Sequence, residues 1–273
     1  MSRPSVPAMD AQLGVEHKVL DHGFVRLIET WGSDERIVEA ARMSTQKGFL
    51  GWGPIVTDEP CKAYTGCAGS TCRICGGDGK HRQPGDEKLL RYLMQNRHET
   101  PFEMAGMVIE VQAPIMVFRE WHRHRTQSYN EMSARYAPLP AVDYLPTVDR
   151  CLTVNGANKQ ANAVKGAAEL THESALAWLE KLADHYQRSE SLYQDGLSAG
   201  VPKELARLAL TFGRYSRMRA SANLRNWLAF LTLRSDVVAS GGAAQWEIRQ
   251  CANAVADLIS QNFPRTYELF LVR

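Results

Sequence analysis

Residues 123–136 read RHRTQSYNEMSARY, and this segment says more about the fold and its site than any other stretch of the chain. It holds three arginines, one histidine, one glutamate and two serines. Guanidinium groups this close together repel one another unless an anion compensates them, and their planar forks suit phosphate oxygens. The segment therefore predicts a site for a phosphate-bearing ligand. The alternative is a solvated, charged face at the end of a helix.

Helices and strands are both predicted around this segment. Alternating apolar residues predict a hairpin over 16–31 and strands over 104–113 and 213–222. Capping signals and helical spacing predict helices from Ser33 to about residue 43, from residue 86, over 114–121, from about 167 to 200, near 223–235 and over 243–262. Residues 45–85 and 137–165 are predicted as an insertion and a loop. We therefore expect an α/β (α+β) fold, a mixed sheet flanked by helices, in one domain over 1–273.

Composition narrows the class of protein. Lysine and arginine number 32 and aspartate and glutamate 30, so the formal charge is +2. That balance argues against a polybasic protein that binds nucleic-acid polymers or membrane surfaces. No apolar run approaches the roughly 20 residues of a membrane span. The N-terminal residues lack the apolar core of a secretory signal, so we expect a cytoplasmic protein.

Four of the six cysteines lie close together in the insertion. The stretch CRICGGDG, which begins at Cys72, is similar to one CxxCxGxG repeat of a zinc knuckle. Cys61, Cys67, Cys72 and Cys75 could thus form a tetrahedral thiolate site for structural zinc. The alternative is a set of reduced thiols in a loop.

Arg123-His124-Arg125, followed after seven residues by Ser133, resembles the signature of the flavin-dependent thymidylate synthases. Further segments resemble this family in the same order along the chain. They are LDHGFVRLIETWG at 20–32, RHETPFE at 97–103, ANLRNWLAFLTLR at 222–234 and AQWEIRQ at 244–250. The resemblance covers nearly the whole chain except 45–85 and parts of 137–165.

The resemblance implies an enzyme that methylates C5 of the uracil of dUMP. NADPH would reduce bound FAD, and methylenetetrahydrofolate would donate the one-carbon unit. It also implies a homotetramer in which several subunits share each active site.

The resemblance further assigns roles to individual residues. The residues implied for FAD are His98, Thr100, Arg123, His124, Arg125, Glu131, Asn223, Leu224 and Arg225. The residues implied for dUMP are Glu120, Arg123, Glu131, Met132, Ser133, Ala134, Arg135, Arg207 (from another subunit) and Arg234. Arg234 matches the family arginine that favours ionised N3 of the uracil, so it is the predicted catalytic residue. Ser133 has no dedicated base beside it in the sequence and is assigned to binding.

Three positions depart from the family pattern. Ala243 precedes Ala244-Gln245 where relatives often have a flavin-contacting histidine, Ala229 stands where an asparagine is common, and Glu120 replaces a glutamine. Two alternatives therefore stay open. One is a flavoenzyme of the same fold that methylates UMP or leaves a hydroxymethyl group on dUMP. The other is a zinc-knuckle protein that binds nucleic acid, against which the near-neutral charge speaks.

Overall fold

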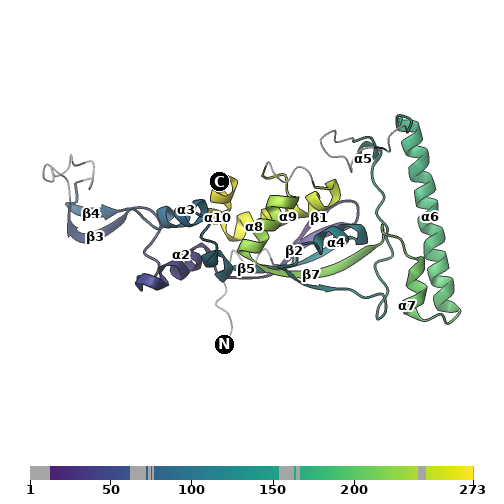
Figure 1. Cartoon of the computed structure of the whole chain (residues 1–273), viewed down its shortest axis with the longest axis horizontal. Coiled ribbons are helices and arrows are strands. Elements are labelled where there is room, and N and C mark those ends of the chain that lie inside the picture. The colour runs from purple at the N-terminus through teal and green to yellow at the C-terminus, as the bar shows by residue number, and fades with distance from the viewer. Residues whose placement is uncertain are drawn as a thin grey trace. The chain divides into compact units, whose positions relative to one another are not determined.

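The computed structural model describes residues 13–61, 72, 75, 77–153, 163, 167–238 and 244–272. The chain divides into two compact units, whose elements are labelled in Figure 1. The first unit consists of the chain up to Thr30, Met107–Ala222 and Asn226–Leu258. The second consists of Trp31–Gly106, Asn223–Arg225 and Ile259–Arg273. The single domain expected over residues 1–273 stays a prediction.

Most of the first unit is built on a five-stranded sheet in the order β1-β2-β5-β7-β6. Its strands are β1 (Glu16–Val19), β2 (Gly23–Trp31), β5 (Gly106–Pro114), β7 (Tyr215–Asn223) and β6 (Ser128–Glu131). β1 and β2 form the predicted hairpin, antiparallel, with Glu16 opposite Arg26. β6 was not predicted, and it pairs antiparallel with β7 at the edge of the sheet. The expected α+β class, a sheet with flanking helices, is confirmed.

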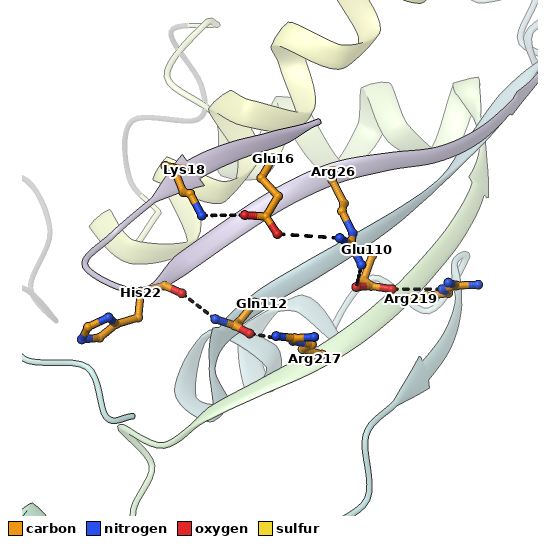
Figure 2. Close-up of polar contacts among 8 residues, drawn as sticks. All are labelled: Glu16, Lys18, His22, Arg26, Glu110, Gln112, Arg217 and Arg219. Carbon is orange, nitrogen blue, oxygen red and sulfur yellow. Dashed lines mark hydrogen bonds and ion pairs between the residues drawn. The ribbon is translucent and has the colours of Figure 1, made fainter. Parts of the chain in front are cut away.

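The two faces of β7 differ in polarity, as its alternating sequence predicts. Met218 and Ala220 are buried, whereas Arg217 and Arg219 are exposed on the other face. Arg219 Nε donates to Glu110 Oε2 at 3.2 Å, and Arg217 Nε donates to Gln112 Oε1 at 2.7 Å. Figure 2 shows these pairs lying together over β5 and β7. The sheet therefore carries a polar face held by ion pairs and hydrogen bonds.

Helices supply much of the core of the first unit. Two of them follow the strands near the C-terminal end, α8 (Leu224–Arg234) and α9 (Trp246–Asn262), close to their predicted bounds. Trp227 and Phe230 on α8 are fully buried, and Trp121 stacks on Phe230 with ring centroids 4.6 Å apart. Trp121 ends α4 (Ile115–Trp121), which begins after Pro114 as predicted. This aromatic packing buries a large apolar area beside the segment 123–136.

The remaining helices of the first unit lie between β6 and β7 in the sequence. They are α5 (Val148–Leu152), α6 (His172–Ser198), α7 (Lys203–Ala206) and the 3₁₀ helix η5 (Arg207–Ala209). α6 is the predicted long helix, and its N-terminus is fixed by a capping box between Thr171 and Ser174. α5 interrupts the predicted loop over 137–165, where the Thr147 hydroxyl accepts from the Arg150 N–H at 3.1 Å. In the described part of the chain, no helix has both the length and the apolar content needed to cross a membrane.

The second unit contains α2 (Asp34–Arg42), α3 (Glu87–Gln95), α10 (Pro264–Leu271) and the 3₁₀ helices η1 (Met43–Thr45) and η3 (Thr100–Met104). Ser33 caps α2 as predicted and accepts from the Arg36 N–H. The α10 helix was not predicted, although Pro264 at its first position is a start signal. The buried Asp34 carboxylate accepts from the backbone N–H groups of Arg265 and Thr266. Its burial raises the pKa of this carboxyl.

The segment 45–85, predicted as a long loop or a small insertion without assigned strands, contains a two-stranded antiparallel hairpin, β3 (Ile55–Pro60) with β4 (Lys80–Gln83). Its base is tied to the second unit. The buried Asp86 carboxylate accepts from the Leu50 N–H at 2.7 Å and from the Arg42 guanidinium. Glu87 Oε1 accepts from the Gly53 N–H at 2.6 Å. The two ends of the insertion are therefore held by carboxylates at the start of α3.

Candidate functional site

A cavity of about 580 Å³ lies in the first unit beside the end of β6. Five residues that the sequence assigned to nucleotide binding line this cavity, namely Glu131, Met132, Ser133, Ala134 and Arg207. Apolar residues form much of the rest of its wall, among them Ile115, Leu139, Leu210 and Phe212. The structure thus brings together two segments that are about seventy residues apart in the sequence.

The backbone after β6 places the first of these segments. The Met132 N–H donates to the Arg217 carbonyl at 2.8 Å, which extends the pairing with β7 by one residue. The chain then turns, because the Ser133 carbonyl accepts from the N–H groups of Tyr136 and Ala137. The Ser133 hydroxyl accepts from the Arg135 N–H at 3.3 Å, which is the one hydrogen bond of that hydroxyl in the described part of the chain. Its assignment to binding stays a prediction.

Arg207 enters the cavity from the first residue of η5. Its Nε donates to the Glu204 carbonyl at 3.3 Å, and its side chain is exposed. The resemblance implied that another subunit supplies this arginine. Within one chain, Arg207 lines the cavity with Ser133, and the contribution of another subunit stays a prediction. The short connection from the end of α6 through α7 brings it there.

Arg234, the predicted catalytic residue, is the centre of a second polar cluster in the first unit. Its Nη1 donates to Glu120 Oε2 at 2.9 Å, and its Nε donates to His124 Nε2 at 3.1 Å. The three residues come from the end of α8, from α4 and from the turn after α4. The His124 ring also packs edge-on against Phe230, with centroids 4.9 Å apart. Arg234 is therefore held in one orientation from two sides.

The charges of this cluster are set by burial and by Arg234. Burial, with the nearby guanidinium, lowers the pKa of His124 to about 4, so the ring is neutral at pH 7. A neutral ring can accept the hydrogen bond that Arg234 Nε donates. Burial raises the pKa of Glu120, and the Arg234 charge opposes that rise. The cluster therefore presents a fixed cation whose neighbours are one carboxyl and one neutral imidazole.

Arg123 and Arg125 flank His124 in the sequence. Both side chains are exposed, and neither pairs with another residue in the part of the chain that the structure describes. Arg135 is also exposed and lies 3.5 Å from the Glu204 carboxylate. Guanidinium groups without a protein partner are suited to phosphate oxygens.

The other residues predicted for the cofactor lie in the second unit. His98 follows α3 after Arg97, whose φ of 54° is left-handed, and its ring packs edge-on against Tyr92. Thr100 begins η3 and is exposed. Leu224 is fully buried, and its N–H donates to the Ala105 carbonyl at 2.7 Å. Its role in the structure is packing, with Asn223 directly before it on the chain.

Arg225, also predicted for the cofactor, is engaged with two carboxylates. Its Nε lies 2.6 Å from Glu99 Oε2, and its Nη1 lies 2.6 Å from Glu103 Oε1. These pairs raise the pKa of the guanidinium, which is charged in any case. Arg225 is thus pre-positioned at the surface by the segment that begins at His98.

Two positions that depart from the family pattern have different outcomes. Ala229 is exposed on α8, so it offers no polar side chain at the position where an asparagine is common in the family. Ala243 lies outside the described residues. Seven cavity residues were not singled out from the sequence, namely Ile115, Leu139, His185, Ala209, Leu210, Thr211 and Phe212. No motif marks them, and His185 looks like any exposed residue of a long helix.

Two further arginines of the sequence have structural partners. Arg214 is almost fully buried, and its guanidinium contacts Asp143 at 3.3 Å and Glu190 at 2.8 Å. Arg26 shares the Glu110 carboxylate with Arg219 on the sheet face of Figure 2. These ion pairs belong to the scaffold.

Three of the four cysteines predicted for metal come together in the insertion. The sulfur atoms of Cys61, Cys72 and Cys75 all lie within 4.8 Å of one another. Cys67 lies outside the described residues.

The fold and the site define an α+β protein that has a cavity of small-molecule size and, in the same unit, an arginine oriented by two side chains. Solved structures show the same fold. The chain is similar to a UMP/dUMP methylase, PolB from Streptomyces cacaoi, in structures bound with 5-Br UMP and with 5-Br dUMP. In the 5-Br UMP structure the TM-score is 0.69 and the identity 28%, over 93% of this chain and 96% of that chain.

Sequence relatives agree with this likeness. The family model described as "Thymidylate synthase complementing protein" matches residues 26–265. The chain is 35% identical to a flavin-dependent thymidylate synthase of Rickettsia typhi, over 98% of this chain and 82% of the relative. It is also 35% identical to one of Thermosipho africanus, over 94% of both chains. The chain therefore belongs to the flavin-dependent thymidylate synthase family.

Proposed function

We propose that this chain methylates dUMP to dTMP, with methylenetetrahydrofolate as carbon donor and NADPH as the reductant that acts through FAD. The observation that carries the proposal is the cavity shared by residues 131–134 and Arg207. Its volume of about 580 Å³ falls in the range of small-molecule sites, roughly 300–1,000 Å³.

The lining of the cavity suits a nucleoside monophosphate. The Arg207 guanidinium can bind the phosphate through paired N–H groups. Ile115, Leu139 and Leu210 offer apolar surface to the flat base. The Glu131 carboxylate can accept from a ribose hydroxyl or a ring N–H, and the Ser133 hydroxyl can donate to a carbonyl oxygen.

Arg234 would stabilise negative charge on the uracil. Its guanidinium is already oriented by His124 and Glu120, so little reorganisation is required when charge develops on a nearby ring. A fixed cation lowers the free energy of the form of uracil ionised at N3. That form is richer in electron density at C5, the atom that is methylated.

The residues around His124 fit a dinucleotide cofactor. Arg123 and Arg125 present exposed guanidinium groups with no partner in the described part of the chain, as a diphosphate requires. His98, Thr100 and the segment 223–225 would hold other parts of FAD. When bound, FAD would supply hydride transfer. We assign no step of this reaction to the cysteine-rich insertion.

A homotetramer with shared active sites is part of the proposal. Large apolar side chains are exposed on α6 and on the segment after it, and a second copy could cover them. Trp178 is 50% exposed, Leu192 64% and Leu208 80%. Phe212, which lines the cavity, is 69% exposed. In such an assembly, Arg207 of one subunit would add to the dUMP site of another, as the family resemblance implies.

One experiment tests the proposal. The purified protein is assayed for bound FAD and then incubated with dUMP, NADPH and methylenetetrahydrofolate, and the nucleotide product is identified by mass. We expect dTMP and dUMP-dependent oxidation of NADPH. Absence of flavin uptake together with absence of dUMP-dependent oxidation would refute the proposal. A product heavier than dTMP by one oxygen would instead indicate hydroxymethylation.

The likeness to PolB favours UMP as a second candidate substrate. That protein is described as a UMP/dUMP methylase, and its structures hold brominated forms of both nucleotides. The same assay with UMP in place of dUMP gives the two values of kcat/KM. If kcat/KM is higher for UMP than for dUMP, UMP replaces dUMP as the substrate in our proposal.

A further inference from the structure

Three cysteine sulfurs form a cluster in the hairpin of the insertion. Cys61 directly follows β3, and its backbone N–H donates to the Gly79 carbonyl at 2.7 Å, just before β4. Cys72 and Cys75 come from the connection between the two strands. The three Sγ atoms lie within 4.8 Å of one another. The hairpin therefore gathers three soft ligands at the point where its strands meet.

The spacing of the sulfurs fits a metal better than a disulfide. The Cys61 and Cys72 Sγ atoms are 3.8 Å apart. A disulfide bond would need about 2.05 Å. Thiolates that bind zinc tetrahedrally at about 2.3 Å lie about 3.8 Å from one another, because that is the edge of such a tetrahedron. The Cys61–Cys72 separation matches that edge, and all three sulfurs lie within 4.8 Å of one another.

The burial of side chains in the insertion also favours a metal site. Among the described residues from 47 to 85, only Cys72 and Cys75 are buried, at 7% and 0% exposure. The large apolar side chains Leu50 and Val56 are exposed, so they form no core. An isolated two-stranded hairpin is at best marginally stable in water. Metal binding can supply folding free energy to a hairpin of this kind.

We propose that Cys61, Cys72 and Cys75 bind one zinc ion, which folds the tip of the insertion. Zinc is a metal expected for a small cluster of thiolates. The proposal does not depend on Cys67. It is independent of the methylation reaction, because the ion holds the hairpin and takes no part in catalysis.

Metal analysis of the full chain tests this proposal. The protein is purified without metal-affinity resin, and its zinc content is measured by inductively coupled plasma mass spectrometry. We expect about one zinc per chain, and at least a tenfold lower content in each of Cys61→Ser, Cys72→Ser and Cys75→Ser. Cys151→Ser is the matched control, since this partly buried cysteine lies on α5 in the first unit, and it should keep its zinc. Equal zinc content in Cys72→Ser and Cys151→Ser would overturn the proposal, as would a Cys61–Cys72 disulfide in the unreduced protein.

A second measurement covers variants that fail to fold. The wild-type protein is stripped with a chelator and titrated with Co²⁺, and the difference spectrum is recorded against the metal-free protein with the same FAD content. Thiolate-to-cobalt charge transfer with tetrahedral ligand-field bands, displaced by one equivalent of zinc, would support the site. Chelation should also speed proteolysis inside residues 61–79 and leave FAD binding unchanged. Cobalt spectra without thiolate charge transfer would overturn it, whatever the methylation assay shows.

Discussion

Replacing Arg234 by glutamine should cost far more in transition-state stabilisation, measured by kcat, than in the free energy of unfolding. The guanidinium of Arg234 makes two side-chain hydrogen bonds, one to a carboxylate and one to a neutral imidazole. The Arg234 and Glu120 side chains are 19% and 26% exposed, so water replaces part of what is lost. We expect a loss of about 1–2 kcal/mol in the free energy of unfolding. For a chain of this size that lowers Tm by about 2–8 °C.

The catalytic loss should be larger because the cation acts where charge develops. Removing one preorganised group of this kind costs about 10²–10³ in kcat, or roughly 2.7–4 kcal/mol of transition-state stabilisation. The pKa of His124 should rise from about 4 in the same variant and stay below its ordinary value, because burial is the larger cause of the shift. Carbon-13 or nitrogen-15 NMR of the imidazole measures that change. A purely structural arginine would not produce it together with a selective loss of kcat.

The assay compares three proteins under saturating dUMP and FAD. Initial rates of dTMP formation give kcat, and thermal denaturation gives Tm for the wild type, Arg234→Gln and Arg119→Gln. Arg119 is exposed on α4 beside Glu120, so its variant should change the stability by less than about 0.5 kcal/mol. The reasoning fails if Arg234→Gln keeps kcat within about threefold of the wild type while Tm falls by the full amount.

Three further outcomes are expected. Arg207→Ala should raise KM for dUMP about 10–100-fold with a smaller change in kcat, as loss of a charged hydrogen bond to phosphate predicts; an unchanged KM in rate measurements would exclude that contact. Stability should fall as pH drops from about 6.5 to about 4, because the unfolded chain protonates His124 first, and His124→Gln should flatten that part of a urea-denaturation series. Gly213→Ala should lower the free energy of unfolding by about 1–3 kcal/mol, since its Cβ would lie 2.8 Å from Tyr186 Cζ. Gly196→Ala, whose Cβ would lie 3.6 Å from Ala206 Cβ, should raise it by about 0.5–1 kcal/mol. Equal Tm values for the two variants would contradict this packing.

The sequence predicted those elements whose buried face or start is visible in their own pattern of residues. The alternation of β7, with Met218 inside and Arg217 outside, identifies a strand with one polar face. Ser33 and Pro114 mark helix starts because a serine hydroxyl can cap the first turn of a helix and the fixed φ of proline suits the start of one. Residues 131–134 were singled out through the family motif, and they do line one cavity.

Other features depend on contacts that no local pattern contains. β6 is a short polar edge strand, and only its pairing with β7 makes it a strand. The ion pairs of Arg214 with Asp143 and Glu190 join segments far apart in the sequence, and their burial cannot be read from any one of them. His185 lines the cavity from the middle of α6, a contact that residue spacing within the helix does not reveal.

The carboxylates at the start of α3 also make the insertion a separable module. The Gly51 carbonyl accepts from the Asp86 N–H at 3.0 Å, so the chain leaves and re-enters the second unit at almost the same point. Segments whose two ends meet can be shortened, lengthened or exchanged with little strain on the elements that they join. Residues 52–84 could thus be replaced by a short glycine linker, or by a reporter domain, while α2 and α3 keep their positions. The same geometry would let the hairpin be removed or exchanged without changing the helices that it connects.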